Sequence, residues 1–356
     1  MQTPKVKTHR PPKHHSNVSC SGVNEQPRFC VAGAGSWGTA LASHLAGNGF
    51  PVTLWGRSAA AMQHMATHGV NQRYLPDHKL ASNLLYSSDL QASLAACNQV
   101  LVAVPSHSFA DMVQHVVAHA PADAGLIWAC KGFEPGSGRL LSELLDESRQ
   151  AKPHAILSGP SFAAELVAGL PTAITVAANQ AAYASAVSQW MHNERFRVYS
   201  TNDLCGVQVG GALKNIYAIA AGISDGLGFG ANARAALITR GLAELMRLAE
   251  QLGARKDTLM GLSGMGDLIL TCTDNLSRNR RFGLAIAEGL SVSEAQQKVG
   301  QSVEGIAATR AAYALGVAHQ VELPIVEQLY GVLEHDRPAH AAVTALLQRQ
   351  SKPEIE

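Results

Sequence analysis

Short apolar runs recur along the first two hundred residues, and each ends in glycine, proline or a polar side chain. Continuous apolar runs without alternation are typical of strands buried on both faces of a parallel sheet. Helix-like segments separate them, so the pattern predicts an α/β fold with a doubly wound parallel sheet. The expected strands are 29–32, 52–55, 100–104, 126–130, 155–157 and 173–176, with 195–199 as a further one.

The pattern of apolar residues changes near residue 200, where the strand-like runs stop. Apolar residues then recur at helical spacing, which predicts an all-helical C-terminal domain. No long flexible linker separates the halves, so we expect them to pack against each other. The expected division is a sheet domain over 28–200 and a helical domain over 201–356.

Residues 1–27 differ from both halves, because they hold four basic residues, one acid and little apolar material. This composition predicts a disordered basic tail. The tail lacks the apolar segment of a secretory signal, and a basic targeting peptide is the alternative.

Composition narrows the class of protein. The 356 residues are 47 % hydrophobic with a net charge of +1, which gives no argument for nucleic acid or an anionic membrane as partner. No run approaches the roughly 18 apolar residues of a membrane helix. None of the six cysteines forms a C-x-x-C pair and the fifteen histidines are scattered, so we expect no metal site. Cys30 and Cys130 lie in apolar runs and are expected to be buried thiols of a cytoplasmic protein.

A glycine turn follows the first expected strand. Gly33, Gly35 and Gly38 have the spacing G-x-G-x-x-G, and Leu41 and Leu45 continue it at helical spacing. The first glycine permits the turn, the second lets the backbone approach a pyrophosphate, and the third lets the helix pack on the strand. The spacing alone is weak, but its place between a strand and a helix predicts a Rossmann-like dinucleotide site.

The second expected strand ends in Arg57 and Ser58. NAD enzymes usually carry an acid here to bind the ribose 2′-hydroxyl, whereas an arginine can pair with the 2′-phosphate of NADP. The sequence therefore favours NADPH, and NADH stays open. A solvated arginine without a cofactor role is the alternative.

Other strand ends deliver polar groups to the edge where such sheets bind ligands. Lys131 follows the run 126–130, and Gly159 and Ser161 follow the run 155–157. Lys131 either points into the cleft or passes the edge as a surface lysine. After the run 100–104, Phe109 either lies against the cofactor or packs in the core.

Lys214 is a more specific candidate for a functional residue than Lys131, because it lies in a strongly apolar helical stretch. A lysine there has to face a cleft or a partner, since burying a bare ammonium is costly, and such a place suits proton transfer. Gly264–Asp267 is expected to form a tight turn whose carboxylate could pair with Lys214.

The cluster 277–281 holds Ser, Arg, Asn, Arg and Arg just before a helical segment. This composition suits a phosphate, although a basic run is more often a solvated face. Glu304 either reaches a cofactor or caps a helix.

The order of the longer motifs resembles one family. GAGSWGTALA, CKGFE, SGPSFA, ALKNIYAIAAGISDGLG, GMGDLILTCTDNLSRNRRFG and VEG are similar to bacterial-type NAD(P)-dependent glycerol-3-phosphate dehydrogenase over about residues 28–340. The resemblance implies reversible reduction of dihydroxyacetone phosphate to sn-glycerol 3-phosphate, a precursor of membrane phospholipids. It also implies a homodimer.

The resemblance assigns roles to residues of this chain. The cofactor would be held by the glycine turn together with Ser36, Trp37, Arg57, Lys131, Ala163, Arg278, Ser302 and Glu304. The substrate would be held by Lys131, Gly159, Ser161, Lys214, Asp267, Ser277, Arg278 and Asn279. Ser302 stands where an apolar residue is common, so a contact there would go through the backbone.

The chemistry of hydride transfer agrees with these roles. Reduction of a ketone builds negative charge on its oxygen, so the protein has to supply orientation and a proton. Lys214 would be the catalytic acid and base, Lys131 would lower its pKa by like-charge repulsion, and Asp267 would orient the amine. Ser277, Arg278 and Asn279 would anchor the phosphate and so place the carbonyl.

Two other functions remain compatible with parts of the sequence. One is a dehydrogenase of another small hydroxy acid, which would need a carboxylate anchor in place of the cluster 277–281. The other is a non-catalytic NADP-sensing protein, which would not need Lys131, Lys214 and Asp267 together.

Overall fold

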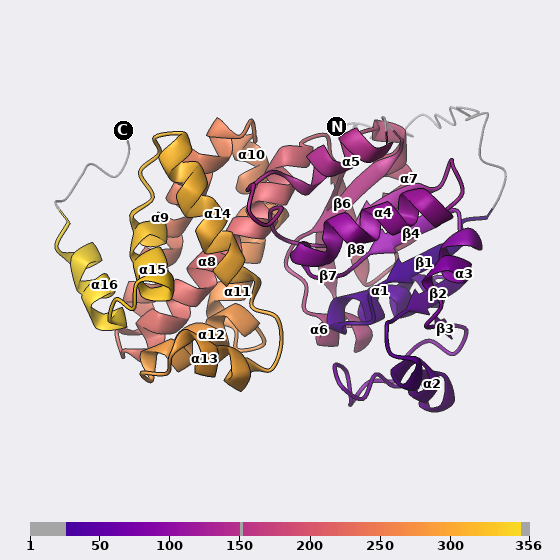
Figure 1. The fold of residues 1–356 in the computed structure, drawn as a ribbon, viewed down its shortest axis with the longest axis horizontal. Helices are drawn as coiled ribbons and strands as arrows, with labels where there is room; N and C mark the ends of the chain where they lie inside the picture. Colours follow the sequence, from indigo (N-terminus) through magenta and orange to yellow (C-terminus); the bar gives the residue numbers. More distant parts are fainter. Residues whose placement is uncertain (1–25, 150–151, 350–356) are drawn as a thin grey trace, which may run out of the picture.

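The computed structural model describes residues 26–149 and 152–349. Within them, the first half of the chain forms one mostly parallel sheet between helices and the second half is helical, which confirms the predicted fold class (Figure 1). All but the last two residues of the predicted tail lie outside the described residues. None of the described helices is long and apolar enough to cross a membrane.

The sheet has the strand order β3-β2-β1-β4-β5-β6-β7-β8. The first six positions reproduce the order of a dinucleotide-binding fold. The strands are β1 (Phe29–Ala32), β2 (Val52–Trp55), β3 (Leu85–Ser87), β4 (Gln99–Val102), β5 (Gly125–Trp128), β6 (His154–Ser158), β7 (Thr172–Ala178) and β8 (Phe196–Thr201). Each of the seven expected runs therefore became a strand, and β3 is one that the apolar pattern did not predict.

One pair of strands departs from the expected parallel sheet, because β7 runs antiparallel to β6. The helix between them, α6 (Ala163–Val167), has five residues and rises only about 7.5 Å. That is too short to return the chain along the five residues of β6, which span about 16 Å. The chain therefore re-enters the sheet at the edge where β6 ends.

Helices cover both faces of the sheet, which explains why its strands are apolar throughout. Residues of α1, α2, α6 and α7 pack on one face, and residues of α3, α4 and α5 pack on the other. Phe109 is fully buried on the second face against Trp128, so its role is packing. The bounds are α1 (Ser36–Gly47), α2 (Ala59–His68), α3 (Leu90–Ala95), η1 (Ser106–Ser108), α4 (Phe109–His119), α5 (Leu141–Arg149) and α7 (Ala181–Met191).

The helical half is built around α8 (Leu204–Gly226), which packs against its neighbours and also against β6 and β7. Eighteen of its residues are buried, so this helix joins the two halves. In Figure 1 it lies between the sheet and the outer helices. The others are α9 (Gly230–Gln251), α10 (Lys256–Leu259), η2 (Leu262–Gly266), α11 (Asp267–Thr273), α12 (Arg278–Ala287), α13 (Val292–Val299), α14 (Glu304–Ala318), α15 (Pro324–Glu334) and α16 (Ala339–Leu347).

Candidate active site

The glycine turn between β1 and α1 has the shape that a dinucleotide requires. Gly33 has a φ of +124°, and a Cβ there would lie 2.6 Å from the carbonyl oxygen of Ala103. A Cβ on Gly38 would lie 1.9 Å from the carbonyl oxygen of Gly33, so the helix packs directly on the turn. A Cβ on Gly35 would meet no atom within 4 Å, which leaves the backbone open to a pyrophosphate. These residues fit the cofactor.

The predicted cofactor residues near this turn lie on three elements. Ser36 and Trp37 open α1, and Ala163 opens α6, which packs against α1. Arg57 is exposed just beyond β2. The strand end lies against the turn, because the N–H of Gly33 donates to the carbonyl of Trp55. The chain at Arg57 therefore leaves the sheet next to the glycine turn.

Two glycines of α8 let this helix approach η2 and the end of β6. A Cβ on Gly210 would lie 2.5 Å from the carbonyl oxygen of Ser263 in η2. A Cβ on Gly211 would lie 2.7 Å from Ser158 Oγ at the end of β6. One helical turn later, Lys214 therefore projects into the junction between the sheet and the helical half.

Two lysines and one aspartate meet in that junction. Lys214 Nζ lies 2.5 Å from Asp267 Oδ1, and Lys131 Nζ lies 2.7 Å from Asp267 Oδ2. Lys214 also donates to Thr271 Oγ1 at 2.7 Å. Asp267 is 1 % exposed and is the first residue of α11, where the helix dipole favours a negative charge. One buried carboxylate thus fixes both ammonium groups.

The pKa of Lys214 is lowered to about 8, and burial is the largest cause. The carboxylate of Asp267 acts to raise this pKa, and the positive charge of Lys131 adds to the lowering. The like-charge effect predicted from the sequence is therefore present, although loss of solvation is the larger cause. A lysine with a pKa near 8 can both give and take a proton close to neutral pH.

The loop after β6 lies next to the lysine pair. Lys131 donates to the carbonyl of Gly159 at 3.2 Å, and Ser161 Oγ donates to the same carbonyl at 2.9 Å. Gly159 has a φ of +139°, and a Cβ there would lie 3.0 Å from the Cα of Ile174. A glycine is therefore required for the loop to turn toward Lys131.

The predicted phosphate cluster opens α12. Ser277 is its N-cap and accepts from the N–H of Arg280, while Arg278 and Asn279 are its first two residues. The first N–H groups of a helix lack acceptors within the helix and face outward with a positive dipole. Asn279 Nδ2 donates to Asn215 Oδ1 at 2.9 Å, which ties this end to the residue after Lys214.

A side-chain hydrogen bond joins the sheet half to the start of α14. Ser106 Oγ, beyond β4, donates to Glu304 Oε2 at 2.6 Å. Burial lowers the pKa of Arg278, and Glu304 acts in the opposite direction. The exposed Ser302 donates to Glu304 Oε1 at 3.3 Å. Glu304 thus begins α14 and faces the sheet half.

Two details of the site differ from expectation. Residues Leu262–Gly266 form a turn of π-helix that continues into α11, where a tight turn was predicted. The glycine permits this close path of the backbone, since a Cβ on Gly264 would lie 2.0 Å from the carbonyl oxygen of Leu259. Of the basic cluster 277–281, Arg280 turns away from the other members and pairs with Asp225.

Sequence reasoning missed three polar partners of the site. Thr271 contacts Lys214, Asn215 contacts Asn279, and Ser106 contacts Glu304. Asn215 had a signal, because it is a second polar residue beside Lys214 in an apolar helix. Thr271 follows Asp267 by one helical turn, which also could have indicated a shared face.

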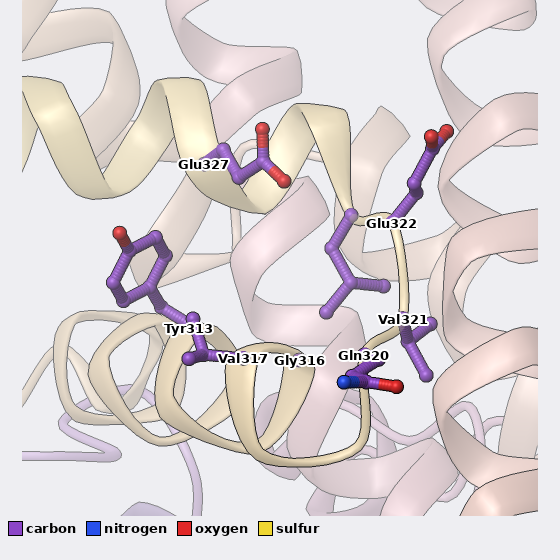
Figure 2. A pocket seen from close by; sticks show the side chains of 8 residues that line it. Tyr313, Gly316, Val317, Gln320, Val321, Glu322 and Glu327 are labelled. Atoms are coloured by element: carbon purple, nitrogen blue, oxygen red, sulfur yellow. The ribbon is translucent and has the colours of Figure 1, made fainter.

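Two surface pockets lie apart from this site. Figure 2 shows one of about 190 Å³ between α14 and α15, where Tyr313, Val317 and Glu327 surround it. The other, of about 350 Å³, lies where the end of α1 meets α6 and β8. None of the predicted site residues lines either pocket. The candidate site is therefore defined by the side chains that converge between the halves.

Comparison with known proteins matches both halves of the chain. Residues 28–184 match the N-terminal model of NAD-dependent glycerol-3-phosphate dehydrogenase, and residues 203–344 match its C-terminal model. The glycerol-3-phosphate dehydrogenase [NAD(P)+] of Nitrosococcus oceani is 51 % identical over 95 % of this chain and 98 % of its own. That of Thioalkalivibrio sulfidiphilus is 52 % identical over 93 % and 99 %.

Solved structures agree with the sequence matches. The crystal structure of glycerol-3-phosphate dehydrogenase from Coxiella burnetii has a TM-score of 0.88 and 44 % identity, and covers 91 % of this chain and 99 % of its own. A structure of the enzyme from Plasmodium falciparum, 19 % identical with a TM-score of 0.81, shows the same fold. The chain belongs to the family of NAD(P)-dependent glycerol-3-phosphate dehydrogenases, which are oxidoreductases.

Proposed function

We propose that this protein reduces dihydroxyacetone phosphate reversibly to sn-glycerol 3-phosphate, with Lys214 as the acid and base. One observation carries the proposal: Lys214 and Lys131 share the buried carboxylate of Asp267 at the junction between the two halves. A regulator that only senses a nucleotide has no use for a buried lysine whose pKa is lowered to about 8.

Lys214 acts on the carbonyl oxygen of the substrate. When bound, the nicotinamide cofactor supplies the hydride that the carbonyl carbon receives. The ammonium of Lys214 stabilises the negative charge that develops on the oxygen and donates one proton to it. In the reverse direction the neutral amine accepts that proton from the hydroxyl. Asp267 holds the amine in place, and Lys131 adds a positive field beside the same oxygen.

The phosphate of the substrate binds at the start of α12. Ser277, Arg278 and Asn279 place hydroxyl, guanidinium and amide groups at a helix N-terminus. Arg278 makes no ion pair with a carboxylate in the part of the chain that the structure describes, so its charge is available to a dianion. Gly159 and Ser161 hold the triose near Lys131. Binding the remote phosphate converts affinity into placement of the carbonyl.

The cofactor binds across the glycine turn and the edge of the sheet. Gly33, Gly35, Gly38, Ser36 and Trp37 surround the pyrophosphate. Toward the nicotinamide side we place Lys131, Ala163, Arg278, Ser302 and Glu304. Arg57 beside the turn favours NADPH over NADH, because a guanidinium pairs with a 2′-phosphate.

A hydroxy acid dehydrogenase is less consistent with this geometry, because its substrate carries no phosphate for the first turn of α12. The homodimer, the cytoplasmic location and the supply of glycerophospholipid synthesis stay predictions from the sequence. Light scattering of the purified chain tests the first of these.

Initial rates test the proposal directly. Dihydroxyacetone phosphate is offered with NADPH and with NADH in parallel, and the loss of reduced-nicotinamide absorbance is followed. We expect rapid oxidation of NADPH and slower oxidation of NADH. The proposed reaction would be contradicted by folded protein that binds NADPH but does not oxidise it when any triose phosphate is supplied.

A further inference from the structure

The side chain of Arg280 joins three separate segments of the helical half. Its Nε donates to the carbonyl of Cys272 at 3.1 Å, Nη1 donates to Asn275 Oδ1, and Nη2 pairs with Asp225 Oδ2. Arg280 is 7 % exposed. A buried guanidinium that uses all three nitrogens holds its partners in one fixed geometry, which a lysine cannot reproduce.

Each of these segments belongs to an element that carries a residue of the site. Cys272 lies in the last turn of α11, which begins with Asp267. Asp225 lies at the end of α8, the helix of Lys214. Asn275 lies in the short connection that leads to Ser277, the N-cap of α12. Arg280 therefore fixes the start of α12 relative to the helices of both Lys214 and Asp267.

The packing around Arg280 leaves little freedom for adjustment. A Cβ on Gly222 of α8 would lie 2.1 Å from the carbonyl oxygen of Arg280, and a Cβ on Gly283 of α12 would lie 2.1 Å from the carbonyl oxygen of Ile219. The backbones of α8 and α12 are thus in direct contact. Asp225 also pairs with Arg234 at 2.8 Å, so the carboxylate is anchored from α9 as well.

The charge of Arg280 is not available to a substrate. It is buried against Asp225, and its donors face Asp225, Asn275 and Cys272. Arg278, two residues earlier, differs in this respect. The cluster 277–281 thus divides into residues that can touch a phosphate and one that holds them in place.

We propose that Arg280 is a positioning residue that sets the phosphate anchor of α12 at a fixed distance from Lys214 and Asp267. This inference rests on the proposed function, because it assumes that Ser277, Arg278 and Asn279 bind the phosphate. Its consequence is selective. Loss of the three-way contact displaces the anchor and penalises a phosphorylated substrate, while a substrate without phosphate never uses the anchor.

The test compares two substrates in the Arg280→Lys variant of the full chain. With NADPH, kcat/KM is measured for dihydroxyacetone phosphate and for dihydroxyacetone. We expect a loss of about tenfold or more for the phosphorylated substrate, mainly in KM, because a misplaced anchor weakens its binding. We expect dihydroxyacetone to change less than twofold, with unchanged NADPH affinity. An unchanged rate on dihydroxyacetone phosphate, or equal losses on both substrates, would overturn the proposal.

Three further variants make the result specific. Arg278→Ala is assayed at saturating NADPH, because Arg278 is also placed beside the cofactor, and it should also lose activity selectively on the phosphorylated substrate. Equal losses on both substrates under these conditions would overturn the phosphate anchor and, with it, this inference. Asn275→Ala removes one contact at an exposed residue and avoids a folding defect, so we expect a selective loss of about two- to threefold. If Arg280→Lys does not fold, Asn275→Ala decides: the absence of a selective loss in that variant would overturn the proposal. Arg310→Lys, in an exposed ion pair with Glu334, is the matched control and should change neither substrate.

Discussion

Lys214 Nζ lies 2.5 Å from Asp267 Oδ1, although 53 residues separate them in the chain. The contact exists because Gly210 and Gly211 let α8 approach η2 and the end of β6, which brings the lysine beside the first residue of α11. The other oxygen of the same carboxylate binds Lys131 from the sheet half. The catalytic centre proposed here is thus assembled from both halves of the chain around one anion.

Turnover should depend on pH in opposite ways in the two directions. The pKa of Lys214 is lowered to about 8, so the ammonium that donates the proton is lost as the pH rises through about 8. Reduction of dihydroxyacetone phosphate should therefore slow above that pH, while oxidation of glycerol 3-phosphate should speed up toward it. Measurement of kcat from pH 6 to 10 in both directions checks this.

A second variant tests the cause of this profile. Because Lys131 lowers the pKa of Lys214, Lys131→Met should move the midpoint for reduction to higher pH, whatever its effect on the rate. A midpoint that stays in place, or moves to lower pH, would contradict the like-charge effect.

Replacing Asp267 by asparagine should impair both catalysis and folding. The variant leaves two ammonium groups without their shared carboxylate, and removal of one partner from a buried pair costs about 3 kcal/mol. We expect kcat to fall about 100-fold, because Lys214 loses its orientation. Urea unfolding and steady-state kinetics give both quantities. The exposed pair of Lys298 and Glu288 supplies the control, Glu288→Gln, which should change the free energy of unfolding by less than about 0.5 kcal/mol.

Two neighbouring glycines should respond differently to alanine. Gly38→Ala places a Cβ 1.9 Å from the carbonyl oxygen of Gly33, so we expect a loss of stability of about 2 kcal/mol or more. Gly35→Ala places its Cβ in open space, so stability should hold while NADPH binding weakens about tenfold or more. Thermal unfolding and NADPH titration separate the two effects. Normal NADPH affinity in Gly35→Ala would rule out the turn as the pyrophosphate site.

Arg57→Ala should change cofactor preference. Loss of the guanidinium removes a charge-assisted contact worth about 1.5–3 kcal/mol. The KM for NADPH should therefore rise about tenfold or more, while the KM for NADH should remain unchanged. Arg197→Ala, at an exposed position of the edge strand β8, controls for the loss of one positive charge. If both cofactors respond equally to Arg57→Ala, Arg57 does not read the 2′-phosphate.

Much of the sheet could be predicted from the sequence, because buried parallel strands are continuous apolar runs. β1 and β2 coincide with their expected ranges. β3 was missed because it has three residues and its first, Leu85, is 61 % exposed. The direction of β7 was not predictable from apolarity, since a strand looks the same in either direction. It depends on the short α6, whose length the pattern did not fix.

The site was predictable wherever a polar residue interrupts or ends an apolar segment. Lys214 in an apolar helix and Lys131 at a strand end are such residues, and the structure joins both through Asp267. The partners of Arg280 were not predictable, because Asp225 lies 55 residues away. A run of basic residues also does not show which of its side chains point into the protein. The π-helical turn before Asp267 was likewise hidden, since its glycines are typical of a tight turn.

The most direct test of the central claim is the turnover of Lys214→Ala with NADPH and dihydroxyacetone phosphate, measured beside NADPH affinity. Lys298→Ala, which removes an exposed ammonium, is the control. The account predicts that Lys214→Ala loses about 1,000-fold or more in kcat while its dissociation constant for NADPH stays within about twofold. Near-normal turnover in this variant would contradict the assignment of Lys214 as the acid and base.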